Sequence, residues 1–303
     1  MTAQPLPVKT GSVKPRLRGL KAFWNHQTFR RVSQLIFAGF IAFLVIQHAI
    51  VGENGATVTP SAEAFCPFGG LETLYKYITS GGKYVPHTHL SNVVLLVAVL
   101  VTGFLLRSSF CGWVCPLGFL QEMVSSLSRF IQKRVPGFRR AIASVKKRGA
   151  RLAFLDRYLR SLKYLILAWA VIGAAYWGVM VFRDYDPWSA LINLAEFSFT
   201  FGFAVLIIIL AASFVVERPW CRYACPLGAA SGIVGKFSPV YLKREASACT
   251  NCKICTRACP MGLDVHNVDT IKSADCITCL ECVGACPRSG ALEVKVGFPM
   301  IGK

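Results

Sequence analysis

The stretches CTNCKICTRACP (residues 249–260) and CITCLECVGACP (residues 276–287) are two copies of one cysteine pattern. In both copies, three cysteines are spaced two residues apart, and a fourth follows after three more residues, directly before a proline. This spacing wraps three thiolates around one face of a four-iron cubane, while the fourth cysteine reaches the neighbouring cluster. The pattern therefore predicts two [4Fe-4S] clusters, one held by Cys249, Cys252, Cys255 and Cys286 and the other by Cys276, Cys279, Cys282 and Cys259.

Two structural zinc ions are the alternative for these eight thiols. Zinc is usually bound by two separated cysteine pairs, whereas here three close cysteines and a distant Cys-Pro recur. The repeat favours clusters, so we expect residues 246–303 to form an α+β domain that carries electrons, called the C-terminal domain below. From about residue 246 to 298 it resembles the bacterial two-cluster ferredoxin.

The rest of the chain is strongly apolar. Its 303 residues are 54% hydrophobic, and its mean hydropathy of +0.48 is high for soluble domains. A helix that crosses a bilayer needs about 20 apolar residues, and four stretches approach that length. They are roughly Val32 to Val51, Leu90 to Leu106, Tyr164 to Phe182 and Phe199 to Val216. We therefore predict an α-helical integral membrane domain over residues 32–245, built as two hairpin halves of four transmembrane helices.

The net charge of +19 follows this predicted topology. Residues 1–31 hold seven Lys and Arg with no acid, residues 107–163 hold thirteen against two acids, and residues 217–303 hold eleven against seven. The connections 52–89 and 183–197 together hold three basic residues and six acidic ones. This pattern places both termini in the cytoplasm of a multi-pass cell (inner) membrane protein. The charge is thus explained without nucleic acid, and the basic N-terminal segment is expected to be retained rather than cleaved as a signal.

A second repeat, Cys-x3-Cys-Pro-Leu-Gly, follows the second and fourth apolar stretches, in residues 107–120 (the first cysteine unit) and 217–230 (the second cysteine unit). Its members are Cys111, Cys115, Pro116, Cys221, Cys225 and Pro226. Proline suits the first position of a helix, so Cys115 and Cys225 are expected at helix N-caps. The positive end of the helix dipole should lower the pKa of both thiols there. We expect the four thiols to converge at the cytoplasmic edge of the membrane.

Three interpretations of these four cysteines remain open. They hold a further iron or iron–sulfur centre, they cycle as dithiol and disulfide, or they pack as small apolar residues, as free cysteine often does. Activated thiolates at helix starts favour a metal centre. A structural disulfide framework is not expected, because thiols on the cytoplasmic side are kept reduced.

Cys66 stands apart from the other twelve cysteines, in a connection expected outside the membrane. It precedes Pro67 and Phe68 in AFCPFGG, but Ala62 replaces the upstream cysteine, so it has no internal partner. One interpretation is a helix cap in a re-entrant or interfacial segment. The other is contact with an extracytoplasmic partner or a quinone head group.

Polar groups at the predicted helix ends are candidates for a quinol site. Such a site needs an apolar slot, hydrogen-bonding groups, and a carboxylate or histidine that accepts protons. The candidates on the outer side are His48, His87, His89, Asp184, Asp186 and Glu196, with Trp188 beside them. Arg107 and Glu122 are the candidates on the cytoplasmic side, and anchoring at the membrane interface is the alternative for each outer residue. Haem is not expected, because C-x-x-C-H is absent and no histidine lies in the middle of a predicted span.

Spans, cysteine units and tandem cluster motifs together resemble the NapH/MauN/NosR family of membrane-bound ferredoxin-like proteins, from about Arg30 to Val296. The closest likeness is a minimal NapH-like quinol dehydrogenase membrane component. The resemblance implies that electrons pass between the quinone pool and a partner reductase or other redox protein. The family's cysteine motifs match the eight cysteines of the tandem motifs and both cysteine units of this sequence.

Two other functions compete with an electron carrier. A maturation factor would reduce or deliver copper or iron to a respiratory metalloenzyme, using the four thiols of the cysteine units as transient ligands. A redox sensor is disfavoured because no output domain is evident. Membrane lipid is an expected partner whether the protein is an electron carrier or a maturation factor. The connection of residues 129–164 is rich in basic and apolar residues, which suits contact with the anionic inner leaflet.

Overall fold

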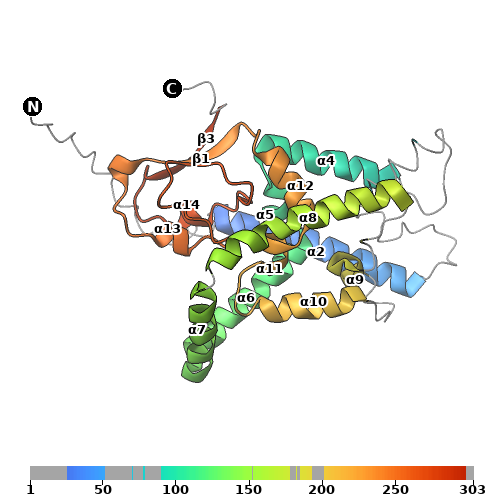
Figure 1. The fold of residues 1–303 in the computed structure, drawn as a ribbon, viewed down its shortest axis with the longest axis horizontal. Coiled ribbons are helices and arrows are strands. Elements are labelled where there is room, and N and C mark those ends of the chain that lie inside the picture. Colours follow the sequence, from blue (N-terminus) through green and yellow to red (C-terminus); the bar gives the residue numbers. More distant parts are fainter. Residues whose placement is uncertain are drawn as a thin grey trace, which may run out of the picture.

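The computed structural model describes residues 26–51, 70, 78, 90–151, 153–177, 182, 185–192 and 201–297. Its first part is helical: α2 (His26–Val51), α4 (Leu90–Leu106), α5 (Ser109–Trp113), α6 (Pro116–Arg134), α7 (Pro136–Arg151), α8 (Ala153–Trp177), α9 (Pro187–Ile192), α10 (Phe201–Ala212), α11 (Pro219–Tyr223) and α12 (Pro226–Gly235). The C-terminal domain contains β1 (Val240–Arg244), the 3-10 helix η4 (Ala246–Ala248), α13 (Ile254–Arg257), β2 (Thr270–Ile271), α14 (Glu281–Ala285) and β3 (Leu292–Val296). The helices α2, α4, α8 and α10 extend away from this domain (Figure 1).

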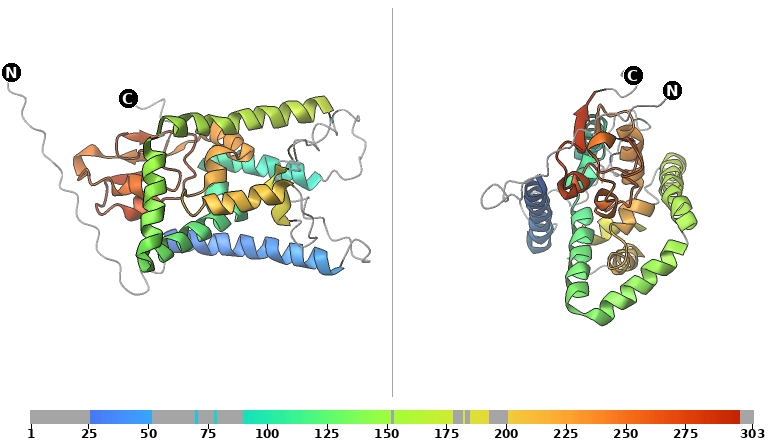
Figure 2. Two further views of the ribbon diagram at one scale, coloured as in Figure 1. Left: turned by 60° about the horizontal axis from the view of Figure 1, so that its bottom comes forward. Right: turned by 90° about the vertical axis from the view of Figure 1, so that its left-hand side faces the viewer.

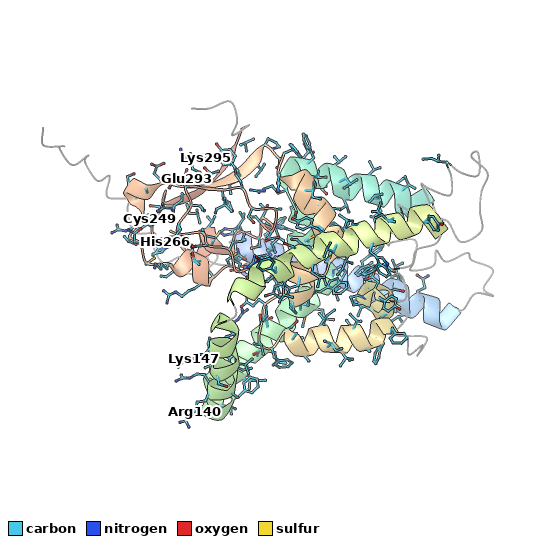
Figure 3. All side chains as sticks on the ribbon, viewed as in Figure 1. Arg140, Lys147, Cys249, His266, Glu293 and Lys295 are labelled. Atoms are coloured by element: carbon cyan, nitrogen blue, oxygen red, sulfur yellow. The ribbon has the colours of Figure 1, made fainter. Side chains whose placement is uncertain are left out.

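The short helices of the two cysteine units lie where the long helices meet the C-terminal domain. In Figure 1, α5, α11 and α12 occupy this central layer, and α7 projects from it across the direction of the long helices. Figure 2 shows α6, α7 and α8 as an arc around one side of the molecule. The basic side chains Arg140 and Lys147 of α7 lie at its outer surface (Figure 3).

Helix lengths agree only partly with the predicted spans. Within the described residues, one helix, His26–Gln47, is long and apolar enough to cross a membrane. Shorter apolar helices cover Asn92–Leu106, Phe201–Ala212 and Pro226–Gly235. With 12 residues, α10 is shorter than the roughly 20 that a span requires. Four transmembrane helices therefore remain a prediction.

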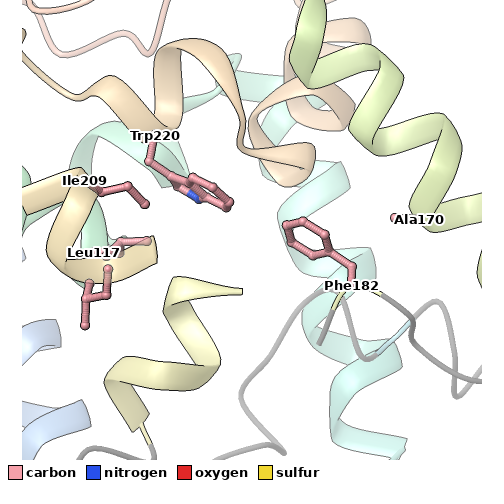
Figure 4. Close-up of a cluster of buried hydrophobic side chains, with 6 residues drawn as sticks. Leu117, Ala170, Phe182, Ile209 and Trp220 are labelled. Carbon is pink, nitrogen blue, oxygen red and sulfur yellow. The ribbon is translucent and has the colours of Figure 1, made fainter. Parts of the chain in front are cut away.

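The chain after α8 departs from the predicted span and outer loop. Phe182, expected at the outer end of a span, stacks on Trp220 of the second cysteine unit with ring centroids 6.1 Å apart (Figure 4). Trp188 and Leu191 of α9 pack into the same buried cluster, which includes Leu117. Burying these large aromatic surfaces stabilises the inward fold of this segment. The described part of the predicted outer loop thus lies against the cysteine units.

The C-terminal domain is built on a three-stranded antiparallel sheet in the order β2-β1-β3. The central residue Leu242 is aligned with Ile271 on one side and with Val294 on the other. Leu242, Ile271 and Leu292 are buried together with Cys276 and Cys282. The sheet therefore begins at Val240, six residues before the predicted domain boundary, and its core includes the predicted cluster ligands.

Candidate functional site

The two tandem motifs fold in the same way around their second cysteine. In the first copy, Asn251 and Lys253 flank Cys252 and have φ values of 54° and 56°. In the second copy, Thr278 and Leu280 flank Cys279 with φ values of 49° and 58°. A left-handed backbone is uncommon for such residues and marks a loop held in a specific shape. Both loops then enter a single helical turn, α13 or α14, that carries the third cysteine.

One set of thiols, called the inner set, gathers within the core of the C-terminal domain. Its members are Cys259, Cys276, Cys279 and Cys282. Burial, followed by the neighbouring thiols of Cys279, Cys276 and Cys259, raises the pKa of Cys282. The fourth cysteine of the first motif thus lies beside the three close cysteines of the second motif. Soft thiolate donors arranged in this way fit a [4Fe-4S] cluster.

The other thiols form the outer set, at the edge of the C-terminal domain away from the helices. Its members are Cys249, Cys252, Cys255 and Cys286. Burial, then Cys286 and Cys249, raises the pKa of Cys255, so these three thiols are also close neighbours. Cys252 is exposed, and the backbone N–H of Ile254 lowers its pKa. Figure 3 shows Cys249 at the outer end of the molecule.

The two cysteine units also share one local structure. Each has an arginine in the left-handed region shortly before its first short helix: Arg107, at φ 60°, is separated from α5 by one residue, and Arg218, at φ 50°, directly precedes α11. A five-residue helix follows, and then Cys115 or Cys225 forms the N-cap of the next helix, as predicted. The Sγ of Cys225 accepts a hydrogen bond from the backbone N–H of Gly228 at 3.3 Å. The repeated sequence thus folds twice into the same structure, a short helix followed by a cysteine that caps a second helix.

The expected fall in the pKa of the capping thiols is wrong. Burial, followed by Cys221 and Cys111, raises the pKa of Cys115 to about 12. The same causes raise the pKa of Cys225 well above its ordinary value. The N-terminal N–H groups of a helix favour a thiolate, but removal from water disfavours it more strongly here. The thiols of the cysteine units raise one another's pKa, which agrees with the predicted convergence of all four.

The helix that begins in each unit, α6 or α12, contributes a polar contact to the first cysteine of the other unit. Gln121, six residues after Cys115, donates from Nε2 to Cys221 Sγ at 3.8 Å. Ser231, six residues after Cys225, places its Oγ 3.9 Å from Cys111 Sγ. In the part of the chain that the structure describes, no three His, Cys, Asp or Glu side chains are grouped tightly enough for a single metal ion. The exchanged contacts relate the two units as a pseudo-symmetric pair.

The inner set lies directly against the cysteine units. Cys279 packs in one buried cluster with Cys111, Cys221, Met261 and Ile277. The indole Nε1 of Trp113 donates to the carbonyl oxygen of Thr278 at 3.0 Å. The loop between the first two cysteines of the second motif is therefore joined to the first cysteine unit, an arrangement that motif spacing alone does not predict.

A buried charge network joins the same elements. Arg30, from the basic N-terminal segment, is 1% exposed and pairs with Glu122 and with Glu281. Arg218 is fully buried, donates from Nη1 to the carbonyl oxygen of Cys111, and also pairs with Glu122. Burial alone would raise the pKa of Glu122, but Arg218 and Arg30 bring it below its ordinary value. Because Cys279 is also influenced electrostatically by Arg30 and Arg218, the two arginines of the network place positive charge beside the inner set.

The two cytoplasmic candidates for a quinol site are engaged in structural contacts. Arg107 donates to the carbonyl oxygens of Ile271 and Ser273 and so holds the loop before Cys276. Glu122 lines a polar cavity of about 560 Å³ at the junction of α2, α6 and α13, away from Cys115. Neither residue lines the apolar cavity described next.

An apolar cavity of about 300 Å³ separates the cysteine units from the segment after α8. Its lining includes all four thiols of the cysteine units: Cys111, Cys115, Cys221 and Cys225. Asp186 and Trp188 line it as well. Asp186 is 7% exposed, and burial raises the pKa of its carboxyl group to about 7, opposed by the backbone N–H of Trp188. Of the outer candidates, the structure thus brings Asp186 and Trp188 to the thiols.

The remaining outer candidates lie outside the described residues. These are Cys66, His87, His89, Asp184 and Glu196, and the side chain of His48 is likewise not described.

Comparison with known proteins agrees with the cysteine patterns. Residues 88–134 and 198–244, which contain the two cysteine units, match a family model described as a 4Fe-4S binding domain. Residues 241–287 match a model described as a 4Fe-4S dicluster domain. The class is therefore a ferredoxin-like electron-transport protein with [4Fe-4S] clusters.

Several curated relatives narrow this class. The putative electron transport protein YccM of Escherichia coli is 28% identical over 96% of this chain and 82% of its own length. The ferredoxin-type protein NapH of Haemophilus influenzae is 29% identical over 65% of this chain and 67% of its own length. The regulatory protein NosR of Pseudomonas aeruginosa is 31% identical over 58% of this chain, a match that spans 23% of NosR. No solved structure matches. These similarities support a ferredoxin-like electron-transfer protein of the NapH/NosR type.

Proposed function

We propose that this protein is a membrane-bound relay that exchanges electrons between the quinone pool and a redox partner through [4Fe-4S] clusters. The observation that carries the proposal is the single buried cluster that contains Cys279 together with Cys111 and Cys221. This cluster connects two thiols that line the cavity, Cys111 and Cys221, with the C-terminal domain. A metal-delivery factor needs exposed transient ligands, whereas Cys111 and Cys221 are 6% and 7% exposed.

The outer surface of the long helices supports a membrane location. Ile36 and Phe43 on α2 are 63% and 60% exposed, and Leu165 on α8 is 68% exposed. Ile208 on α10 is 67% exposed. Soluble proteins rarely expose so much apolar surface, whereas lipid covers it favourably. In this arrangement, both termini and the C-terminal domain lie in the cytoplasm.

The proposed ligand sets give the relay an order. The cluster held by Cys259, Cys276, Cys279 and Cys282 would be the inner one, next to the cysteine units. The cluster held by Cys249, Cys252, Cys255 and Cys286 would be the outer one. Because Cys252 is exposed, a soluble partner would exchange electrons there.

When bound, the clusters supply one-electron redox centres. The chain's own residues position them and set their surroundings. Arg30 and Arg218 stabilise negative charge near the inner set, and burial of Ile277 and Met261 excludes water from the contact with the cysteine units. The cysteine units would hold a further iron–sulfur centre, an assignment supported by the family model that matches both of them.

Protein purified without oxygen in detergent tests this function. Iron and acid-labile sulfide are counted, and cluster EPR is followed after addition of a menaquinol analogue. We expect about eight iron atoms per chain from the C-terminal domain alone, and more if the cysteine units bind a centre. Cys111→Ser and Cys221→Ser should keep the EPR signals of the C-terminal domain but lose exchange with quinol, whereas the surface variant Ser144→Ala should behave as wild type. Unchanged exchange in both cysteine variants, with lost metal loading of a partner enzyme, would favour a maturation factor.

A further inference from the structure

The cavity between the cysteine units and α9 has the size and polarity of a small-molecule site. Its volume of about 300 Å³ falls at the lower end of the range for ligand pockets. Phe110, Phe182 and Trp220 supply flat aromatic walls, and Leu117 and Val114 complete an apolar lining. Such a cavity accepts an aromatic ring and is poorly suited to a charged metabolite.

Two polar groups in the cavity lack the partners that buried groups normally have. Among the described residues, the backbone N–H of Trp188 is the one hydrogen-bond donor to the carboxylate of Asp186, at 3.1 Å from Oδ1. No basic side chain in the described part of the chain pairs with Asp186. The indole Nε1 of Trp188 is buried and has no hydrogen-bond partner there. Since a buried unpaired donor or carboxylate is costly, both groups indicate a ligand with oxygen atoms.

The position of the cavity links it to both lipid and electrons. Phe37 and Phe40 of α2 line it and are 41% and 48% exposed, so it reaches the apolar surface of the helices. The opposite wall contains Cys115 and Cys225. A lipid-soluble ligand that enters beside α2 would therefore meet the thiols of the cysteine units.

We infer that this cavity binds the head group of a quinone or quinol, with Trp188 donating a hydrogen bond to a ring oxygen and Asp186 exchanging the hydroxyl protons. The inference rests on the proposed function and assigns its substrate site. The site is the cavity that lies between α9 and the two cysteine units.

The redox step balances within this arrangement. Oxidation of one bound quinol breaks two O–H bonds, forms two C=O bonds, and releases two electrons and two protons. The two [4Fe-4S] clusters that the tandem motifs would hold would act as the oxidant, and each oxidised cluster would take up one electron. Asp186 accepts one hydroxyl proton, releases it to water, and then accepts the second. With reduced clusters and quinone the same steps run in reverse.

Binding of a fluorescent quinone analogue, 2-heptyl-4-hydroxyquinoline N-oxide, to the cluster-loaded protein in detergent tests the site. Trp188→Phe should weaken binding roughly three- to tenfold, because one hydrogen bond is lost. Leu227→Trp, which fills the cavity, should abolish binding. Asp186→Asn should slow cluster reduction by menaquinol at least tenfold, while reduction by dithionite is unchanged. Asp269→Asn is the matched control, because its side chain is 76% exposed and is not part of the cavity lining.

The outcomes separate this inference from the proposed function. If menaquinol reduces the wild-type clusters but analogue binding is unchanged in Trp188→Phe and Leu227→Trp, the site lies elsewhere and the relay stands. If the analogue binds and both variants weaken it while menaquinol and clusters never exchange electrons, the site stands and the relay is wrong. Iron content equal to wild type shows that each variant has folded, and Leu227→Trp gives a result even if Asp186→Asn does not fold.

Discussion

Arg218 and Glu122 form a buried ion pair in which Arg218 Nε donates to Glu122 Oε1 at 3.2 Å. The pair joins the start of the second cysteine unit to the helix that follows the first. Glu122 also pairs with Arg30, so one carboxylate bridges two arginines that are 1% exposed or less. The two halves of the helical part are thus held together by charge at the point where the C-terminal domain attaches.

Glu122→Gln should strongly destabilise the protein, because it removes the carboxylate that pairs with the buried Arg218 and leaves Arg30 with Glu281 alone. The expected loss is about 3–5 kcal/mol, measured by denaturant unfolding in detergent. Glu217→Gln is the matched control. Its partner Arg129 is 52% exposed, so the loss should be at most about 1 kcal/mol. Equal stability of the two variants would show that the buried network does not hold the halves together.

Gly112→Ala should loosen the C-terminal domain from the cysteine units. A Cβ at Gly112 would collide with the backbone carbonyl oxygen of Ile277. Because the clash is with backbone and not with the end of a flexible side chain, it can be relieved only if the two segments move apart. We expect a loss of about 1–3 kcal/mol and faster trypsin cleavage after Lys236. Gly137→Ala, which meets nothing within 4 Å, should be cleaved at the wild-type rate. If both variants are cleaved equally, the close approach seen at Gly112 is not important for docking.

Lys163→Met should make the inner cluster more labile than the outer one. Lys163 is 1% exposed and pairs with Asp275, the residue directly before Cys276. Removing its charge leaves Asp275 with Arg160 alone, so the loop that carries Cys276 is held less firmly. EPR during exposure to air should show one cluster signal decaying several-fold faster than in wild type. Arg244→Met, which removes a pair with the exposed Asp269, is the control, and identical decay of both signals in Lys163→Met would contradict this role.

Asp156 should contribute stability that is lost in acid. Burial raises its pKa, but hydrogen bonds from Tyr223, Arg222 and Arg160 outweigh burial and lower the pKa to about 2 from an ordinary value of 3.8. Because the folded pKa is the lower one, the contribution is complete above about pH 4 and disappears as the pH falls to about 2. Asp156→Asn should therefore melt below wild type at pH 6, and the difference should shrink toward pH 2. A difference independent of pH would mean that the ionised carboxylate is not what stabilises the fold.

Much of the candidate site was predictable because metal-binding spacing is local in sequence. The eight cysteines of the tandem motifs and the N-caps at Cys115 and Cys225 follow from short motifs, whose geometry depends on a few adjacent residues. The family models match the same segments. Local spacing was therefore sufficient for the class of protein.

The rest depends on contacts between distant segments, which spacing does not encode. The raised pKa of Cys115 comes from burial by elements far along the chain, and so does the pairing of Arg30 with Glu122. In the sequence, Arg30 is one of seven basic residues in residues 1–31, and nothing local distinguishes it from the others. The inward fold of Phe182 onto Trp220 was missed because an apolar run does not show where a helix ends.

Stopped-flow mixing of the anaerobically purified protein with a menaquinol analogue, and of the reduced protein with the matching quinone, tests the central claim most directly. The account predicts electron exchange between the quinone pair and the [4Fe-4S] clusters in at least one direction, and loss of that exchange in Cys111→Ser. Intact clusters that react with dithionite but with neither quinol nor quinone would contradict it.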